Sequence, residues 1–228
     1  MHPRAGAPAR TPCAVRYHRS PPTSTKRHQA NLRNSTRAGR TNALARISVD
    51  RAGIVRAASQ IASPNSDERP EGTPITLLVL HGISLPPGEF GGPGIVELFT
   101  NRLDPAAHPY YRKIAKLRVS SHFLIRRDGA LVQFVPCEKR AWHAGESSWR
   151  GRHGCNDFSI GIELEGTDDS PYETAQYSTL SRLSRGLSRR YGITDAARHS
   201  DVAPGRKTDP GEGFDWARYR RMAGFASP

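Results

Sequence analysis

The residues of this chain that are best suited to chemistry gather near its C-terminus. His199, Lys207 and Asp209 all lie within the glycine- and proline-rich segment HSDVAPGRKTDPG. In an extended segment, side chains two positions apart point the same way, so Lys207 and Asp209 can face one site. His81, which closes the apolar run ITLLVLH far upstream, offers a third ligand. Two histidines and one carboxylate, with a fourth position open to water, are a common ligand set for catalytic zinc.

Each of these residues also has an ordinary structural explanation. A single histidine at the end of a strand is usually structural or simply exposed. Asp209 is followed by proline and glycine, a combination that favours turns, and a single lysine is most often a solvated surface charge. The spacing is not a short zinc motif such as H-E-x-x-H. The residues alone therefore leave both a zinc site and a structural role open.

The elements around His81 can be read from the pattern of apolar residues. The continuous apolar run at 75–81 is typical of a buried central strand. The Gly/Pro-rich segment 82–94 that follows it is long for a simple turn, so we expect a loop that helps to form a site. Residues 95–103, IVELFTNRL, then predict a short helix.

Two further segments predict strands. Asp128-Gly129 lies between the apolar runs HFLIRR and ALVQFV, which is a strong signal for a β-hairpin. The segment 157–166, DFSIGIELEG, alternates with a period of two, so Glu163 and Glu165 share one face of the predicted strand. That face can line a pocket or lie in solvent, and the pattern does not decide between them.

Helical periodicity is clearest between Pro171 and Tyr191, where we expect Ser170 to cap the helix and Glu173 to complete a capping box. A shorter helix is predicted in FDWARYRRMAG, and residues 46–73 predict a short helix or irregular entry followed by a polar loop. Mixed strands and helices with a hairpin predict an α/β (α+β) fold, a single domain with a central mixed β-sheet flanked by helices.

The charge of the chain is concentrated at its N-terminus. Of 228 residues with a net charge of +13, residues 1–49 hold ten Lys/Arg and no acidic residue, which leaves +3 for the rest. We therefore expect residues 1–45 to be a disordered basic extension, or sequence upstream of a wrongly assigned start, and the folded domain to span 46–225. The extension has one aromatic residue, Tyr17, so nucleic-acid binding is not expected. No apolar stretch suits a signal peptide or a membrane span.

The cysteines favour a reducing compartment. Cys13, Cys137 and Cys155 form no C-x-x-C pair and are odd in number, which argues against a disulfide framework. Cys155 has no obvious base beside it in the sequence, so we interpret it as structural rather than nucleophilic. A cytoplasmic location is the expectation.

Several long motifs carry a resemblance to a known family. In order, and from about residue 46 to residue 222, the chain contains LLVLHGISLPPGEFGGPGI, RVSSHFLIRRDGALVQFVP, KRAWHAG, CNDFSIGIELEG and HSDVAPGRKTDPGEGFDWARY. Together they closely resemble the cytoplasmic 1,6-anhydro-N-acetylmuramyl-L-alanine amidases, which have the zinc amidase and peptidoglycan-recognition fold. Residues 1–45 lie outside the resemblance.

The resemblance implies a function and a set of site residues. The implied reaction is hydrolysis of the amide between (1,6-anhydro-)N-acetylmuramic acid and L-alanine of muropeptides during peptidoglycan recycling, by a protein that we expect to be a monomer. The implied roles are Zn²⁺ ligands for His81, His199 and Asp209, catalysis for Glu163 and Lys207, a wall of the substrate groove for Trp142, and binding of a stem-peptide carboxylate for Arg118.

The chemistry of amide hydrolysis suggests how the catalytic pair would act. We expect Glu163 to take a proton from the attacking water and to deliver it to the departing amine. Lys207 would stabilise the negative oxygen of the tetrahedral intermediate.

Two glycines depart from the pattern of the family that the chain resembles, and the sequence also leaves two alternative functions open. Gly82 stands where the family carries asparagine and Gly154 where it carries arginine, so recognition of the peptide carboxylates can differ in detail. The alternatives are a non-catalytic peptidoglycan-binding module of the same fold and a periplasmic amidase acting on intact cell wall.

Overall fold

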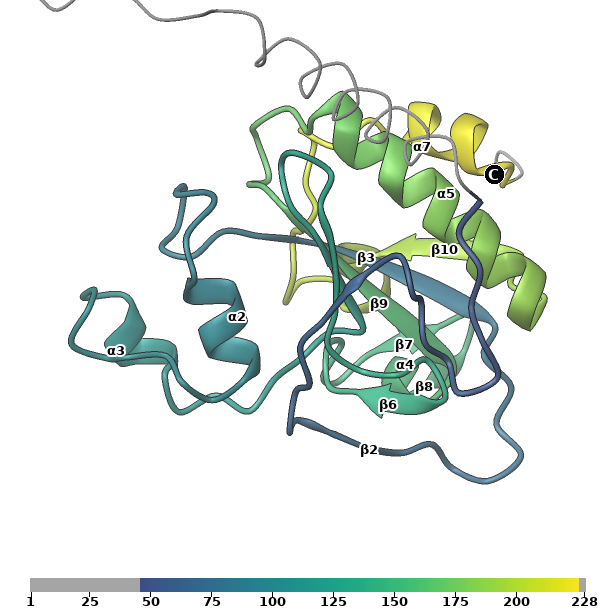
Figure 1. Ribbon diagram of the computed structural model, residues 1–228, viewed down its shortest axis with the longest axis horizontal. Coiled ribbons are helices and arrows are strands. Elements are labelled where there is room, and N and C mark those ends of the chain that lie inside the picture. The colour runs from purple at the N-terminus through teal and green to yellow at the C-terminus, as the bar shows by residue number, and fades with distance from the viewer. Residues whose placement is uncertain (1–45, 226–228) are drawn as a thin grey trace, which may run out of the picture. The chain divides into compact units, whose positions relative to one another are not determined.

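A six-stranded mixed sheet organises the part of the chain that the structure, a computed structural model, describes, residues 46–225 (Figure 1). The predicted α/β (α+β) class, with a central mixed sheet flanked by helices, is confirmed. Neighbouring strands are parallel except for the β4–β5 pair. In spatial order the strands are β1 (Ser59–Gln60), β5 (Leu131–Gln133), β4 (Phe123–Ile125), β9 (Ser159–Glu165), β3 (Leu77–Ile83) and β10 (Asp195–Arg198).

The two long strands, β3 and β9, form the centre of this sheet. They pair in parallel over seven residues, from Leu77 opposite Ser159 to Ile83 opposite Glu165. Both faces of a central parallel strand are covered, which is why the sequence here is a continuous apolar run rather than an alternating one. The strand predicted at 75–81 is confirmed, with its observed start two residues later.

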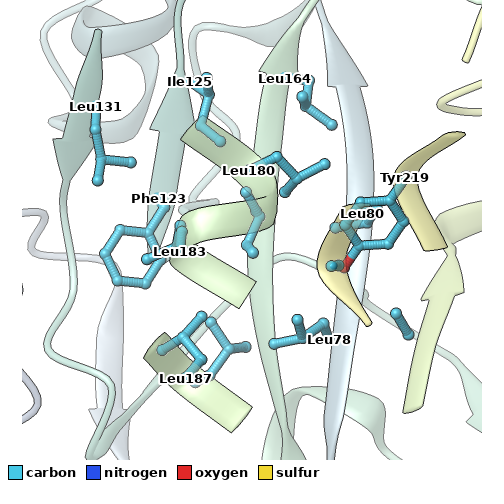
Figure 2. Close-up of a cluster of buried hydrophobic side chains, with 14 of the residues drawn as sticks. Leu78, Leu80, Phe123, Ile125, Leu131, Leu164, Leu180, Leu183, Leu187 and Tyr219 are labelled. Carbon is cyan, nitrogen blue, oxygen red and sulfur yellow. The ribbon is translucent and has the colours of Figure 1, made fainter. Parts of the chain in front are cut away.

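One face of the sheet is covered by α5 (Thr174–Tyr191) and α7 (Trp216–Ala223), which lie side by side (Figure 1). Figure 2 shows leucines of α5 pointing into the apolar side chains of the strands. The predicted buried stripe of the helix is therefore confirmed, and it consists of Tyr177, Leu180, Leu183 and Leu187.

The start of α5 differs from the prediction. The N-cap is Glu173, whose side chain accepts from the backbone of Gln176, while the side chain of Gln176 accepts from the backbone N–H of Glu173. Ser170 and the turn after it remain outside the helix. The amide of Gln176 also donates to the carbonyls of Ile125 and Glu165, so this capping box fastens the helix to two strands.

The opposite face is covered by short helices and loops. α2 (Gly94–Phe99) and α3 (Tyr111–Ile114) carry one apolar cluster there. α4 (Cys155–Phe158) and α6 (His199–Val202) belong to a second one. The helix predicted at 95–103 is therefore real but ends at Phe99.

The hairpin predicted around Asp128-Gly129 is present as the antiparallel pair β4–β5. Two smaller sheets were not predicted. β2 (Ser66–Glu68), within the predicted polar loop, pairs antiparallel with β6 (Lys139–Ala141), and β7 (Ser148–Trp149) pairs with β8 (Arg152–His153).

Two expectations from the sequence concern other parts of the chain. The predicted basic extension, residues 1–45, lies outside the described residues. Within residues 46–225, no helix combines the length and the apolar character that crossing a bilayer requires.

Candidate active site and metal centre

A cleft of about 420 Å³ opens on the sheet face opposite α5, near the carboxyl ends of β3 and β9. This volume falls in the range of ordinary small-molecule sites. Carboxyl ends of parallel strands share one edge of a sheet, which makes this edge a common place for a site. The polar side chains that line it are His81, Ser84, Ser120, His143, Glu163, Thr167, Asp168, His199, Lys207 and Asp209.

Three of these side chains bring ligand atoms together. The Nδ1 atoms of His81 and His199 are 2.9 Å apart, and Oδ2 of Asp209 lies 3.4 Å and 3.1 Å from them, respectively. Ligands bound to zinc at about 2.0–2.1 Å in a tetrahedron are separated by about 3.3 Å. Two ring nitrogens that face each other beside a carboxylate oxygen are satisfied together by one cation placed among them. The donor set therefore fits a metal ion such as Zn²⁺.

The protonation states also suit a metal site. Burial, with a smaller contribution from the neighbouring His199, lowers the pKa of His81 to about 4. A neutral imidazole is the form that binds a metal. Burial alone would raise the pKa of Asp209, but hydrogen bonds with His199 and His81 outweigh it and hold that pKa well below its usual range. His81 is thus neutral and Asp209 ionised at neutral pH.

Pairing of β3 with β10 brings the two histidines together although 118 residues separate them in the sequence. Leu80 lies opposite Arg198 in the register, so the residues that follow them, His81 in β3 and His199 at the start of α6, fall at the same level. Asp209 then reaches the site from the loop after α6. The backbone N–H of Ser200 donates to the Asp209 carbonyl at 3.1 Å and holds the loop close to the helix.

Glu163 lies directly across the strand pair from His81 in the register of β3 and β9. It is only 7% exposed, yet it lines the cleft. Burial raises the pKa of Glu163 well above its ordinary value, the charge of Asp209 raises it further, and Lys207 partly opposes the rise. A carboxylate with a raised pKa is a stronger base, as general acid–base catalysis near neutral pH requires.

The solvent-exposed alternative for this strand face is wrong. Glu165, two residues after Glu163, is 1% exposed and pairs with Arg126 at 2.8 Å. Its carboxylate also accepts from the backbone N–H of Gly91 and of Arg127. The loops and helices of this side cover the whole face, which the alternation of β9 by itself could not reveal.

Lys207 approaches the cleft from the exposed side. Its backbone N–H donates to the carbonyl of Ala203, which holds the residue in the turn after α6. Among residues 46–225, no side chain or carbonyl takes a hydrogen bond or ion pair from its ammonium group. The charge is therefore available to an anionic atom bound in the cleft.

Trp142 follows β6 and lines the cleft, and its role as a wall of the substrate groove stays a prediction. Its indole Nε1 donates to Asp67 at 3.1 Å, and both oxygens of that carboxylate also accept from Arg140. The ring is therefore oriented by a residue of β2, a strand that was not predicted. Asp67 carried no signal in the sequence beyond its charge.

Arg118 lies beside the cleft rather than in it. Its exposed guanidinium group donates to the carbonyls of Ala115 and Leu117. Its sequence neighbours Leu117 and Val119 are the ones that line the cleft. The role in binding a peptide carboxylate stays a prediction.

The two glycines that depart from the family pattern have structural reasons. A Cβ on Gly82 would collide with the hydroxyl of Tyr172, which donates to the carbonyl of Pro210 directly after Asp209. Gly154 has φ of +73°, a conformation that L side chains rarely adopt. The next residue, Cys155, is fully buried, in agreement with a structural role.

Some site features were missed from the sequence. His143 belongs to the motif KRAWHAG, and its ring contacts His81, a contact that the motif does not indicate. Tyr110, Ile114 and Leu117 form an apolar wall of the cleft. They lie in and around α3, whose single turn is too short to give a periodic signal.

Comparison with known protein families identifies the class of enzyme to which the chain belongs. The family model for N-acetylmuramoyl-L-alanine amidases matches residues 71–212. The chain belongs to this amidase family, and the resemblance read from its motifs is confirmed.

Within this amidase family, the chain is similar to proteins named AmpD. The chain is 58% identical over 172 residues to the 1,6-anhydro-N-acetylmuramyl-L-alanine amidase AmpD of Escherichia coli (strain K12), covering 74% of this chain and 93% of that protein. It is 56% identical to AmpD of Citrobacter freundii, covering 75% and 92%. A crystal structure of a selenomethionine AmpD derivative superposes with a TM-score of 0.75 at 56% identity, covering 76% of this chain and 98% of that one.

Proposed function

We propose that this chain hydrolyses the amide bond between 1,6-anhydro-N-acetylmuramic acid and L-alanine in muropeptides, with a zinc ion held by His81, His199 and Asp209. The observation that carries the proposal is the convergence of these three ligand atoms within 4.8 Å of one another, beside a buried carboxyl group and an exposed ammonium group. The anhydro sugar is proposed because the AmpD relatives described above bear it in their names.

Amide hydrolysis needs an activated water, a proton for the leaving amine and compensation of the oxyanion charge. Zinc, when bound, lowers the pKa of water to about 7 and polarises the carbonyl. Glu163, whose raised pKa favours proton uptake, takes the proton of the attacking water and passes it to the amine. Lys207 donates to the oxygen that becomes negative in the tetrahedral intermediate.

The rest of the cleft binds the substrate in this proposal. Trp142, held by Asp67, presents an aromatic face to the sugar, and the apolar wall around α3 excludes water beside it. Arg118, at the rim, is proposed to meet a carboxylate of the stem peptide. An Arg118→Ala variant should then show a raised KM for the peptide substrate with little change in kcat.

The direct test incubates the zinc-loaded protein with anhydro- and reducing-sugar muropeptides and identifies the products by mass. We expect release of the intact stem peptide with a free L-alanine N-terminus, and faster release from the anhydro substrate. Binding without cleavage would instead support the non-catalytic peptidoglycan-binding module, and cleavage at another bond would refute the proposed amide hydrolysis. Faster cleavage of intact cell wall than of free muropeptides would support the periplasmic alternative.

Metal content tests the ligand assignment separately. Asp209→Ala should lose most of its bound zinc, measured by elemental analysis after dialysis. The control is Asp169→Ala, since this aspartate is exposed and does not line the cleft. A variant without Asp209 that still holds one zinc per chain would contradict the assignment.

We further propose that residues 46–225 are the amidase domain of a monomeric, cytoplasmic enzyme of peptidoglycan recycling that binds no nucleic acid. A variant that begins at residue 46 should retain full activity in the muropeptide assay. Loss of activity on this truncation would show that residues 1–45 contribute to the reaction.

A further inference from the structure

His143 lies beside the proposed zinc ligands but is not used in the mechanism above. Its Nδ1 is 3.0 Å from Nε2 of His81, the ring nitrogen that points away from His199 and Asp209. The two rings meet edge to face, with centroids 5.1 Å apart. His143 is therefore placed to act on the metal site through His81.

A chain of hydrogen bonds continues behind His143 and ends at a backbone carbonyl. Nε2 of His143 is 3.2 Å from Oγ of Ser159, and that hydroxyl donates to the carbonyl of Cys155 at 2.5 Å. A carbonyl oxygen only accepts, and two oxygens this close need a proton between them. The hydroxyl proton of Ser159 is therefore committed to Cys155.

Because the Ser159 hydroxyl donates to Cys155, the donor and acceptor of the next two hydrogen bonds, Ser159–His143 and His143–His81, are fixed. Since the Ser159 oxygen can only accept from His143, the proton of His143 sits on Nε2, and its Nδ1 is left as an acceptor. That acceptor takes the Nε2–H of His81. A neutral imidazole with its proton on Nε2 has a lone pair on Nδ1, which is the atom that faces His199 and Asp209.

We propose that His143 is a positioning residue that holds His81 in the tautomer required for metal binding, with its direction set by Ser159 and the Cys155 carbonyl. The inference rests on the proposed zinc site. Outer partners that orient a ligating histidine typically affect metal affinity by about 10- to 100-fold.

The residues around His143 leave space for its ring and hold its backbone in place. A Cβ on Gly161 would lie 2.5 Å from the His143 ring, so only glycine leaves the ring its place against β9. The side chain of Asn156 accepts from the backbone N–H groups of His143 and Ala144, at 3.1 Å and 2.8 Å. By contrast, Nε2 of His199 is buried without a hydrogen-bond partner among the described residues. Among the described residues, a hydrogen-bond partner therefore orients His81 through its Nε2 atom, and none does so for His199.

The test compares His143→Asn with His143→Leu in the full-length protein. Asparagine and leucine have nearly the same shape, and the Oδ1 of asparagine can replace Nδ1 as the acceptor. Zinc affinity is measured by competition with a chromophoric chelator. We expect the leucine variant to bind zinc about 10- to 100-fold more weakly than the wild type and the asparagine variant to stay within about threefold.

A second measurement determines the tautomer of His81 in the metal-free protein. In long-range ¹H–¹⁵N spectra of the metal-free protein, His81 should be in the Nε2–H form in the wild type and in His143→Asn, and a mixture in His143→Leu. Ser159→Ala, which leaves His143 in place, should weaken zinc binding by about 2- to 10-fold, the worth of one hydrogen bond. Thermal unfolding of the metal-free variants checks that each one folds.

The outcomes separate this inference from the proposed function. Equal zinc affinities of the leucine and asparagine variants, whether high or low, would overturn the role of the acceptor. A wild-type His81 with mixed tautomers in the metal-free protein would overturn it as well. A wild type that binds no zinc would refute the metal site itself, and with it the positioning role.

Discussion

The two halves of the site are built in different ways. His81 and Glu163 stand on neighbouring strands at the centre of the sheet, paired over seven residues and almost fully buried. Lys207 and Asp209 lie on the irregular segment after α6, where Lys207 is exposed and the Asp209 side chain is 16% exposed. The most deeply buried groups are on the sheet, and the groups that we propose to meet the substrate or complete the metal site are on the loop.

The difference teaches how a rigid scaffold and an open site are combined. Strand pairing fixes the distance and burial of the sheet half before any ligand is present, whereas loop segments open locally at much lower free-energy cost. Substitutions of His81 and Glu163 should therefore change both chemistry and stability, and a substitution of Lys207, whose ammonium has no partner among the described residues, should change chemistry alone.

The largest effect is expected from Glu163→Gln. Loss of the general base should lower kcat by about 100- to 10,000-fold, while bound zinc stays near one per chain. The matched control is Glu165→Gln, on the same face of β9. Breaking its buried pair with Arg126 should cost about 3 kcal/mol of stability and leave kcat within a few-fold. Wild-type turnover in the Glu163 variant would remove the base assignment.

Lys207→Met should lower kcat by about 100- to 1000-fold, the usual result of deleting one oxyanion donor. The unfolding temperature should not change, since the ammonium is exposed and forms no ion pair among the described residues. The control is the adjacent Arg206→Met, whose guanidinium donates to the carbonyls of Ala144 and Glu146. This control should lower the unfolding temperature and spare kcat, so the same stability loss in both variants would contradict the division into two halves.

The pH dependence of stability should report the buried histidines. Burial and the nearby Arg69 lower the pKa of His122 to about 3. Since this folded-state value lies below the unfolded one of about 6.5, the stabilisation is complete above pH 6.5 and is lost as the pH falls toward 3. Thermal unfolding of the metal-free protein between pH 7 and pH 4 measures the loss. His122→Asn should flatten this profile, and an unchanged slope would assign the loss to other groups.

The smallest expected effect is a difference between the strands and the 199–209 segment in how much zinc slows their hydrogen exchange. Hydrogen exchange of the metal-free protein should be slow at Leu80 and Ile162 and faster at Ser200 and Lys207. Zinc should slow exchange more in the 199–209 segment than in the strands. Mass spectrometry after deuterium labelling resolves these segments, and equal slowing in both would show that the loop is already rigid without metal.

Much of the fold could be predicted because its central elements have strong local patterns. The apolar run of β3, the alternation of β9, the hairpin at Asp128-Gly129 and the leucine stripe of α5 all follow from side-chain periodicity. β10 was missed because its four residues, Asp195–Arg198, contain only two apolar side chains, both alanine. It forms a strand because β3 offers an unpaired edge, and that is a tertiary effect.

The site was predictable where residue type alone suggests a role. The three metal-ligand candidates and Glu163 were found from chemistry and resemblance, and the structure brings them to one cleft. His143 and Asp67 were not found because their importance depends on which side chain they contact. Neither contact can be read from the spacing of residues along the chain.

Strand β9 devotes one face entirely to the site. Ser159 links His143 to the Cys155 carbonyl, Gly161 makes room for the His143 ring, Glu163 faces the cleft and Glu165 fastens the loop after β3. These four positions follow one another in steps of two residues, about 6.6 Å each. Inserting or deleting a single residue within this strand would turn the positions on one side of the change toward α5 and so break up the set. Variation among descendants of this chain should therefore reach β9 by substitution and leave its length untouched.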